Sequence, residues 1–396
     1  MSKTKQYKEG FKMKVLNKEK LYKSVKQNIE NDIKHGKMGG AAATVIQNGE
    51  VVCDLKLGYK NITTQEPLSE NTLFRLASLT KPVSGVACMI AVEKGYFSLD
   101  DNVSKYFPQI DNMYIGRLEN GKVVPDRKPQ VKIKMRDLLT HTNGIMGENA
   151  LAAPQEYLMP DSTFTSNQAM VDYVLNNTFL TFEPTKGSAY SGYASFDIMA
   201  LVIEQKSGLT YAEFVNKYIF EPLGIKDITF NPTEEQWSRM ITMTDRVAGN
   251  KCVAIDMGNH TFEGFSLNYA CAGASLAGSI ESYAIFGEML RRGGEYNGVR
   301  IISPESVKAI ATPYVPMGTP GLSPYDSWGL GVRVTVNNPV LPKGCFGWSG
   351  AYGAHFWVDT ENQITAVYMK NSRWYDSHGG GKTASDFEKS VMDALE

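Results

Sequence analysis

A serine and a lysine three residues apart are the residues of this 396-residue chain that first suggest chemistry. Ser78 and Lys81 stand just before a strongly apolar stretch. If a helix begins near Ser78, positions i and i+3 share one face with Cβ atoms roughly 5–6 Å apart, so the hydroxyl and the amine can meet. The positive end of the helix dipole favours negative charge at Ser78 and disfavours an ammonium at Lys81. The pair predicts a nucleophile beside a base; the alternative is a serine N-cap and a solvated lysine.

A nucleophilic serine also needs a group that moves protons. Tyr190 is the candidate, because it precedes a helical stretch within a glycine-punctuated loop at residues 182–193. A phenol and an alkyl ammonium ordinarily lose their protons only at about pH 10, so close placement must make either one a base near neutral pH. The alternative is a loop aromatic with a packed ring and a capped hydroxyl.

The reaction needs hydrogen-bond donors for the oxyanion as well. Residues 347–353 read Gly-Trp-Ser-Gly-Ala-Tyr-Gly at the end of a β-rich run. Glycines let a backbone approach a ligand closely, so a strand-edge N–H in this segment could face a substrate carbonyl. The alternative is an ordinary glycine-rich turn between strands.

The hydrophobic pattern indicates a helix that would hold the serine. Within residues 82–91, apolar side chains recur at the i, i+3, i+4 and i+7 positions of a buried helix. Gly95 is a suitable end, and Pro82 fits only in a first turn. We therefore expect a helix to begin close to Ser78 and to place the hydroxyl at its positive end.

The other elements follow from the same patterns. Residues 17–35 predict an amphipathic surface helix, and two apolar runs on either side of Asn48-Gly49 predict a β-hairpin. Asn120-Gly121 indicates a second hairpin, and residues 147–161 read as a long loop that could border a cleft. Further helices are expected at residues 135–141, 195–207, 211–220, 282–292 and 383–395, and β-rich runs at 328–336, 344–349, 354–358 and 364–371.

This order predicts an α+β fold in which an antiparallel sheet, flanked by N- and C-terminal helices, is interrupted by a mainly α-helical lobe. The α/β lobe would comprise residues 1–77 and 260–396, and the helical lobe residues 78–259. A substrate would bind in the cleft between the two lobes.

The composition of the chain argues against several classes of function. Hydrophobic residues make up 42% and charged residues 21%, as in an ordinary globular protein, and the net charge of −1 gives no electrostatic footprint for nucleic acid or an anionic membrane. The five cysteines lack the spacing of a zinc site or a disulfide framework. No stretch predicts a membrane span or a signal peptide, so we expect a cytoplasmic location unless a leader has been removed. The oligomeric state is left open.

The segments, taken in order, resemble the serine β-lactamase-like superfamily, in the branch that holds class C β-lactamases, D-alanyl-D-alanine carboxypeptidases and family VIII carboxylesterases. The resemblance runs from about residue 18 over nearly the whole chain. It rests on the segments GGAAATVIQNG (39–49), TLFRLASLTK (72–81), RDLLTHTNG (136–144), EPLG (221–224), GWSG (347–350) and MKN (369–371).

The resemblance implies a β-lactamase-like fold and a serine hydrolase without a cofactor or metal. Ser78 would be the acylated nucleophile, Lys81 its partner and Tyr190 the proton shuttle. The backbone N–H groups of Ser78 and Ala351 would form the oxyanion hole. Trp348, Ser349, Gly350 and Tyr352 of the same C-terminal segment are the candidates for substrate binding. Among the aromatics, Trp348, Tyr352, Trp374 and Tyr375 could line an acyl or alcohol pocket; the alternative is that they are core residues, the commoner place for aromatics in a β-rich region.

Two departures from the pattern of the β-lactamases favour an ester over a β-lactam. Gly192 stands where the Tyr-x-Asn motif has the asparagine that holds the substrate's amide. Trp348-Ser349-Gly350 replaces the Lys-Thr-Gly motif whose lysine helps to hold a carboxylate, and is similar to the W-x-G of the esterases. We therefore expect a carboxylesterase that acts on small or short-chain esters. The alternatives are a β-lactamase or D-amino-acid-specific peptidase, an acyltransferase, and a non-catalytic penicillin-binding or sensing relative.

Three histidines could suggest other chemistry. His141 is a candidate for a triad base, but it begins a turn, so a capping role is the better interpretation. His355 and His378 lack metal-ligand spacing. Residues 378–381 read His-Gly-Gly-Gly, as in the oxyanion loop of α/β-hydrolases, but the chain has no G-x-S-x-G elbow, so we interpret them as a flexible loop.

Overall fold

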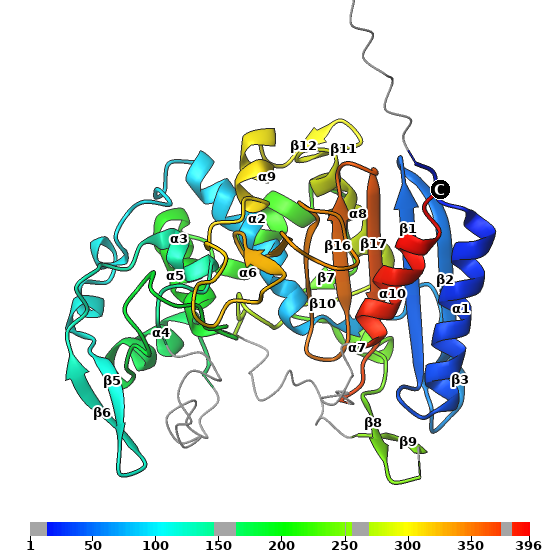
Figure 1. Ribbon diagram of the computed structural model, residues 1–396, viewed down its shortest axis with the longest axis horizontal. Coiled ribbons are helices and arrows are strands. Elements are labelled where there is room, and N and C mark those ends of the chain that lie inside the picture. Colours follow the sequence, from blue (N-terminus) through cyan, green and yellow to red (C-terminus); the bar gives the residue numbers. More distant parts are fainter. Residues whose placement is uncertain (1–13, 146–163, 250, 256–268, 374–381) are drawn as a thin grey trace, which may run out of the picture.

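The structure, a computed structural model, describes residues 14–145, 164–249, 251–255, 269–373 and 382–396. An antiparallel sheet with helices on both faces lies beside a mainly helical region (Figure 1). This is the α+β arrangement that the order of the sequence patterns predicts. Among the helices that are described, none combines the length and apolar character that a membrane crossing requires.

The main sheet has eight strands in the order β13–β14–β15–β16–β17–β1–β2–β3, and each neighbouring pair is antiparallel. The strands are β1 (Gly40–Gln47), β2 (Glu50–Asn61), β3 (Glu66–Pro67), β13 (Asp326–Trp328), β14 (Arg333–Thr335), β15 (Phe346–Ser349), β16 (His355–Asp359) and β17 (Ile364–Met369). Because β1 pairs with β17, one sheet unites the two ends of the chain.

The hairpin predicted at Asn48-Gly49 is confirmed. Asn48 and Gly49 have φ angles of 54° and 84°. A two-residue turn with two positive φ angles matches the twist of the flanking strands, which explains why asparagine and glycine stand there. β2 continues to Asn61, beyond the apolar run.

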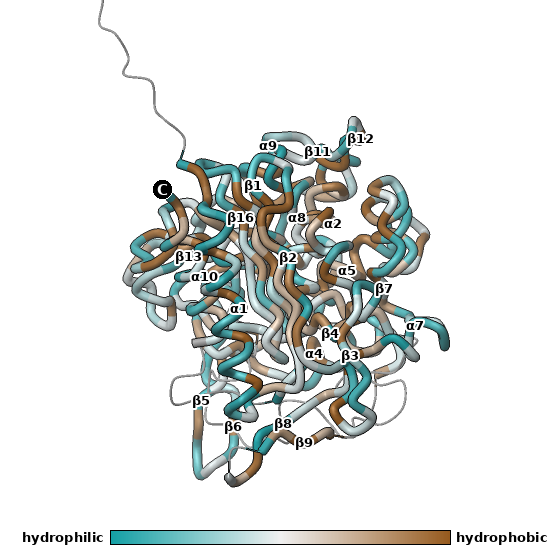
Figure 2. Tube along the Cα trace, turned by 90° about the vertical axis from the view of Figure 1, so that its right-hand side faces the viewer, coloured by the Kyte–Doolittle hydropathy of each residue, from teal (hydrophilic) through white to brown (hydrophobic). Residues whose placement is uncertain are grey.

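Helices cover both faces of the sheet. α1 (Lys18–Lys34) and α10 (Lys382–Asp393) lie side by side on one face, and α8 (Ile280–Arg291) packs on the other (Figure 1). Along β1, Ala43 and Val45 face the first layer, and Ala42 and Ile46 face the second. The strand is therefore buried on both sides, and in Figure 2 the mainly hydrophilic α1 lies in front of it.

The helical region and the smaller elements complete the fold. Its helices are α2 (Thr80–Glu93), α3 (Met135–Leu139), α4 (Asn167–Asn177), α5 (Ala194–Ser207), and α6 (Tyr211–Val215), which continues as one π turn, η5 (Asn216–Phe220). Short helices are α7 (Glu234–Ser238), α9 (Pro304–Ile310), and the 3-10 turns η2 (Val103–Lys105) and η3 (Pro108–Asn112). Small sheets pair β5 (Ile115–Glu119) with β6 (Lys122–Arg127), β8 (Thr244–Val247) with β9 (Lys251–Ala254), β11 (Glu295–Tyr296) with β12 (Val299–Arg300), and β10 (Ala277–Gly278) with both β4 (Phe74–Arg75) and β7 (Ile228–Thr229).

The central helix begins two residues later than Ser78. A 3-10 turn, η1 (Ala77–Leu79), holds the serine, and α2 follows it at once. The predicted apolar stripe is only part of what is buried, because every residue from Thr80 to Ala91 is buried. α2 is therefore the core of the helical region rather than a surface helix.

Some of the predicted elements differ from the structure, and others lie outside the described residues. The β-rich run at residues 328–336 is split into β13 and β14 by a turn in which Gly331 has a φ of 75°. α4 was not predicted, since its polar and apolar residues give a weak periodicity. The loop expected at 147–161 lies outside the described residues.

Candidate active site

Ser78 sits on the turn that opens α2, at the bottom of a cavity of about 460 Å³. The Thr80 hydroxyl donates to the Ala77 carbonyl at 2.7 Å and holds the turn closed. Ala77 itself has a φ of 45°, which is uncommon for a residue with a Cβ and costs conformational energy. The turn lifts the partly exposed Ser78 out of the buried helix and into the cavity.

Lys81 is fully buried one turn further along α2. Its Nζ lies 3.4 Å from Ser78 Oγ, and it donates to two backbone carbonyls, that of Gly192 at 2.7 Å and that of Gly273 at 2.9 Å. All three contacts are donations from Nζ, so two carbonyls hold the amine with its third polar direction toward Ser78 Oγ. The expected meeting of hydroxyl and amine is present in the structure.

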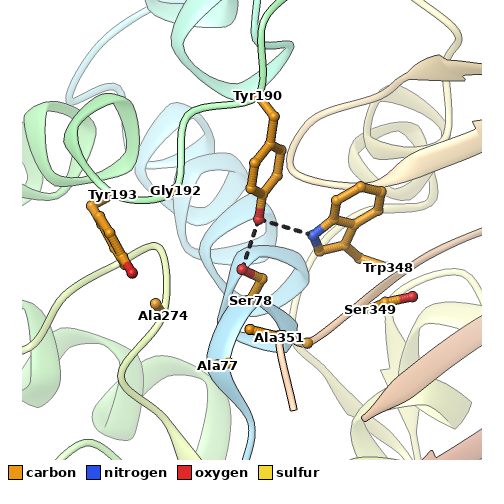
Figure 3. Close-up of a pocket in the computed structure, with 10 residues that line it drawn as sticks. Ala77, Ser78, Tyr190, Gly192, Tyr193, Ala274, Trp348, Ser349 and Ala351 are labelled. Carbon is orange, nitrogen blue, oxygen red and sulfur yellow. Dashed lines mark hydrogen bonds between the residues drawn. The ribbon is translucent and has the colours of Figure 1, made fainter. Parts of the chain in front are cut away.

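Tyr190 completes a three-residue cluster around the serine. Its hydroxyl donates to Ser78 Oγ at 2.7 Å (Figure 3). Its ring lies 4.7 Å from Lys81 Nζ. The indole Nε1–H of Trp348 donates to the Tyr190 oxygen at 3.3 Å. The phenol therefore bridges the nucleophile to an uncharged donor from β15.

His141 packs against the Tyr190 loop and holds it by a hydrogen bond. Its Nδ1 accepts the Ser191 N–H at 3.1 Å, and its ring lies 4.8 Å from that of Tyr190 and 4.4 Å from that of Trp328. Burial, aided by the charge of Lys81, lowers the pKa of His141 well below its usual value, so the ring is neutral. The hydrogen bond from Ser191 to His141 agrees with the capping role that the sequence analysis favoured for this histidine.

The end of β15 brings the residues 348–351 to the other side of Ser78. A Cβ on Gly350 would lie 2.3 Å from the Leu76 carbonyl oxygen, so only glycine allows this close approach. The N–H groups of Ser78 and Ala351 have no hydrogen-bond acceptor among the described residues. Both amides are thus available at the place where the sequence predicted an oxyanion hole.

Ser349 lines the cavity, but its hydroxyl turns away from Ser78 (Figure 3). It bonds Nδ1 of His355 at 2.8 Å, and Nε2 of His355 lies 3.0 Å from the carboxylate of Glu388 on α10, which also pairs with Arg333 at 2.6 Å. Burial opposes the charge of Glu388, but the contacts with His355 and Arg333 outweigh it and hold the pKa of this carboxyl at about 2. The hydroxyl thus anchors β15 to a buried charge network.

The cavity has two walls. We call Tyr190, Gly192, Tyr193 and Ala274 the helical wall, and residues 348–351 the sheet wall. No charged side chain belongs to either wall among the described residues. Tyr352 is buried in a small cluster with Ala77 and Met243 behind the cavity and does not line it. Trp374, Tyr375 and the loop at 378–381 lie outside the described residues.

Several residues of the site could not be found from the sequence. The Gly192 and Gly273 carbonyls are backbone groups, for which no sequence signal exists. The His355–Glu388 contact joins a strand to a helix 33 residues away and depends on the register that places His355 opposite Ser349. No cluster of three or more His, Cys, Asp or Glu side chains suited to a metal ion occurs in the described part of the chain.

The fold agrees with the comparison to known proteins. The Beta-lactamase family profile matches residues 25–384, and the chain belongs to this family. The family comprises serine hydrolases with a β-lactamase-like fold, including esterases, acyltransferases and penicillin-binding proteins. The fold and the family predicted from the sequence are thereby confirmed.

Individual relatives cover nearly the whole chain. Esterase EstB of Burkholderia gladioli is 24% identical over 376 residues, which cover 89% of this chain and 90% of EstB. Protein Rv1367c of Mycobacterium tuberculosis is 24% identical over 351 residues, covering 84% and 86%.

Solved structures share the fold over the same extent. EstCE1, described as a hydrolase with promiscuous acyltransferase activity, superposes with a TM-score of 0.79 at 22% identity and covers 95% of this chain and 99% of its own. Simvastatin synthase LovD of Aspergillus terreus has a TM-score of 0.76 at 18% identity, covering 93% and 97%.

Proposed function

We propose that this chain is a carboxylesterase that forms an acyl-enzyme on Ser78 and acts on small or short-chain esters. The observation that carries the proposal is the convergence of Tyr190 and Lys81 on one hydroxyl, at 2.7 and 3.4 Å. A nucleophilic hydroxyl with groups in reach that can take up and return its proton is the requirement of covalent acyl transfer.

The proposal gives each group a role. Ser78 Oγ attacks the ester carbonyl carbon as its proton passes to the amine of Lys81, and the carbonyl oxygen gains negative charge opposite the N–H groups of Ser78 and Ala351. The C–O bond to the alcohol then breaks as Tyr190 donates its hydroxyl proton to the leaving oxygen, and Lys81 returns the serine's proton to Tyr190. Water, deprotonated by the same pair, cleaves the acyl-enzyme and restores Ser78.

The walls of the cavity support an uncharged substrate. A carboxylate placed in it would meet no charged side chain among the residues described, and Trp348 stands at the position where the β-lactamases have a lysine. Burying an unpaired carboxylate costs several kcal/mol, about the whole binding energy of a small ligand. A neutral ester therefore fits this cavity better than a β-lactam or the C-terminus of a peptide.

A chromogenic short-chain ester tests the proposal. We expect a burst of alcohol equal to the enzyme concentration, followed by a slower steady rate if deacylation limits turnover. An acyl adduct on Ser78 should appear in intact-mass spectra and be absent in Ser78→Ala. Full turnover by folded Ser78→Ala would refute the proposal. Faster hydrolysis of nitrocefin or D-Ala-D-Ala than of esters would favour the peptidase alternative, and a stable adduct without turnover would favour a binding protein.

Transfer of the acyl group to an alcohol or amine is a second candidate outcome. The fold is shared with EstCE1, for which acyltransferase activity is stated, and both routes use the same acyl-enzyme. Adding an alcohol during ester turnover distinguishes the two, because a transferase gives the new ester in place of the free acid.

A further inference from the structure

The segment at residues 269–273, which we call the strap, supplies one of the two carbonyls that hold the amine of Lys81. The Gly273 carbonyl accepts from Nζ at 2.9 Å and the Gly192 carbonyl at 2.7 Å. These two contacts fix where the third tetrahedral position of the nitrogen points, and Ser78 Oγ lies there at 3.4 Å. A small displacement of the strap would turn the amine away from Ser78.

Buried side chains hold the strap on both of its edges. Asp197, on α5, accepts the Ala272 N–H at 2.8 Å, and Ser84, on α2, donates to the Ala272 carbonyl at 2.6 Å. Ser84 in turn accepts from the Tyr211 hydroxyl at 2.7 Å. The strap is pressed closely against the helical wall, because a Cβ on Gly273 would lie 2.2 Å from the Gly192 oxygen.

Asp197 differs from the other anchors because it can carry charge beside Lys81. It is fully buried and accepts from the Tyr269 hydroxyl, and Cys271 Sγ lies 3.7 Å away. The titratable groups that face it are Lys81 of α2, Tyr211 of α6, and Tyr269 and Cys271 of the strap. Burial raises the pKa values of the two tyrosines and the thiol, so these three stay neutral near pH 7.

The protonation of Asp197 is therefore tied to that of the catalytic amine. Burial raises the pKa of Asp197 to about 7, against hydrogen bonds from Tyr269 and the strap and the charge of Lys81, which lower it. The charge of Lys81 is among the groups that favour the ionised form of Asp197, so the two charges act on each other across the buried site.

We propose that Asp197 is a positioning residue that controls Lys81 in two ways, by fixing the Gly273 carbonyl through the strap and by adding a negative charge beside the amine when it ionises. The inference rests on the proposed roles of Ser78 and Lys81. It requires no ligand or partner beyond the substrate.

Two variants separate the two effects. Asp197→Asn removes the charge and one of the two acceptors of the strap, whereas Ser84→Ala loosens the same strap and leaves the charge unchanged. For each variant, kcat and KM for a short-chain ester are measured from about pH 5 to about pH 9. The rate at which a fluorophosphonate labels Ser78 is followed over the same range, because it reports activation of the serine without any natural substrate.

We expect both variants to lower kcat about tenfold with KM changed less than about twofold. Only Asp197→Asn should move the ascending limb of the pH profile, and the limb should move to lower pH because Lys81 loses its counter-charge. If Asp197→Asn does not fold, Tyr269→Phe replaces it; loss of this donor makes ionisation of Asp197 harder, so the limb should move the same way by a smaller amount.

The measurements distinguish failure of this proposal from failure of the proposed esterase function. An unchanged limb in Asp197→Asn, or the same shift in Ser84→Ala, would overturn the proposal. Labelling of Ser78 that follows the predicted pH shift in a protein that hydrolyses no ester would support the role of Asp197 and refute only the esterase function.

Discussion

The two walls of the cavity are supported by opposite kinds of polar contact. Behind the helical wall, burial holds His141 neutral and raises the pKa of Asp197 to about 7. Behind the sheet wall, Glu388 keeps its charge, with a pKa of about 2, because His355 and Arg333 surround it. Neutral side chains behind the helical wall place no fixed charge beside the site. The paired charges around Glu388 hold the end of β15 in place and keep Glu388 ionised over a wide pH range. In the mechanism we propose, the helical wall handles protons and the sheet wall supplies Ala351, one of the two oxyanion donors.

The largest effect is expected when the groups that would transfer protons, Tyr190 and Lys81, are removed. Tyr190→Phe deletes the hydroxyl that bonds Ser78 and keeps the ring, and Lys81→Met deletes the amine. We expect each to lower kcat for a short-chain ester by about 10²–10⁴ with little change in KM, the usual contribution of an acid or base. Steady-state kinetics on variants with unchanged circular dichroism measure this. More than a tenth of the wild-type kcat in Tyr190→Phe would contradict the assignment.

A pair of glycine substitutions compares the walls directly. Gly273→Ala and Gly350→Ala each place a Cβ within 2.3 Å of a backbone carbonyl oxygen, of Gly192 and of Leu76 respectively. Each should lower the free energy of unfolding by about 1–3 kcal/mol through overpacking and reduce kcat. Only Gly273→Ala should also change the pH profile, because it moves a hydrogen-bond partner of Lys81. Equal pH profiles in the two variants would contradict the division between the walls.

A smaller effect is expected where the walls meet, at the hydrogen bond from Trp348 to Tyr190. Trp348→Phe removes the 3.3 Å donor and keeps an aromatic ring. Loss of one neutral donor should lower kcat about five- to tenfold. The matched control is Trp328→Phe, since Trp328 contacts Tyr190 through its ring, at 6.0 Å between centroids. A similar loss in both variants would mean that packing, rather than the hydrogen bond, supports Tyr190.

The opposite pKa shifts predict opposite dependences of stability on pH. The pKa of Glu388 is depressed from 4.5 to about 2, so its stabilising contribution is complete above pH 4.5 and is lost as the pH falls towards 2. The pKa of Asp197 is raised from 3.8 to about 7, so its contribution is complete below pH 3.8 and is lost as the pH rises towards 7.

Melting temperatures between about pH 3.5 and pH 7.5 test these directions. Glu388→Gln should differ most from the wild type near neutral pH, and Asp197→Asn should differ most in acid. Lys389→Ala, which removes an exposed ion pair with Asp393 on the same helix as Glu388, is the control and should change stability by less than about 1 kcal/mol at any pH. Parallel curves for the two carboxyl variants would contradict the predicted signs.

The sequence by itself determined the elements that depend on local pattern. The hairpin at Asn48-Gly49, the buried helix after Ser78, the antiparallel strands near the C-terminus and the terminal helices follow from periodicity and turn chemistry, which act between residues close in the chain. The Ser78–Lys81 pair could be recognised for the same reason, because a separation of three residues within a helical turn fixes a distance.

Only the tertiary structure decided which distant groups meet these two residues. Tyr190 lies 112 positions from Ser78 and Gly273 lies 192 positions from Lys81, and no local rule gives their approach. The charge states of Asp197 and Glu388 were equally hidden, since a carboxyl of either residue can be neutral or ionised according to its burial and its partners. Both the approach of these distant groups and the charge states of the two carboxyls depend on how the helices and strands pack together, which is a property of the whole fold.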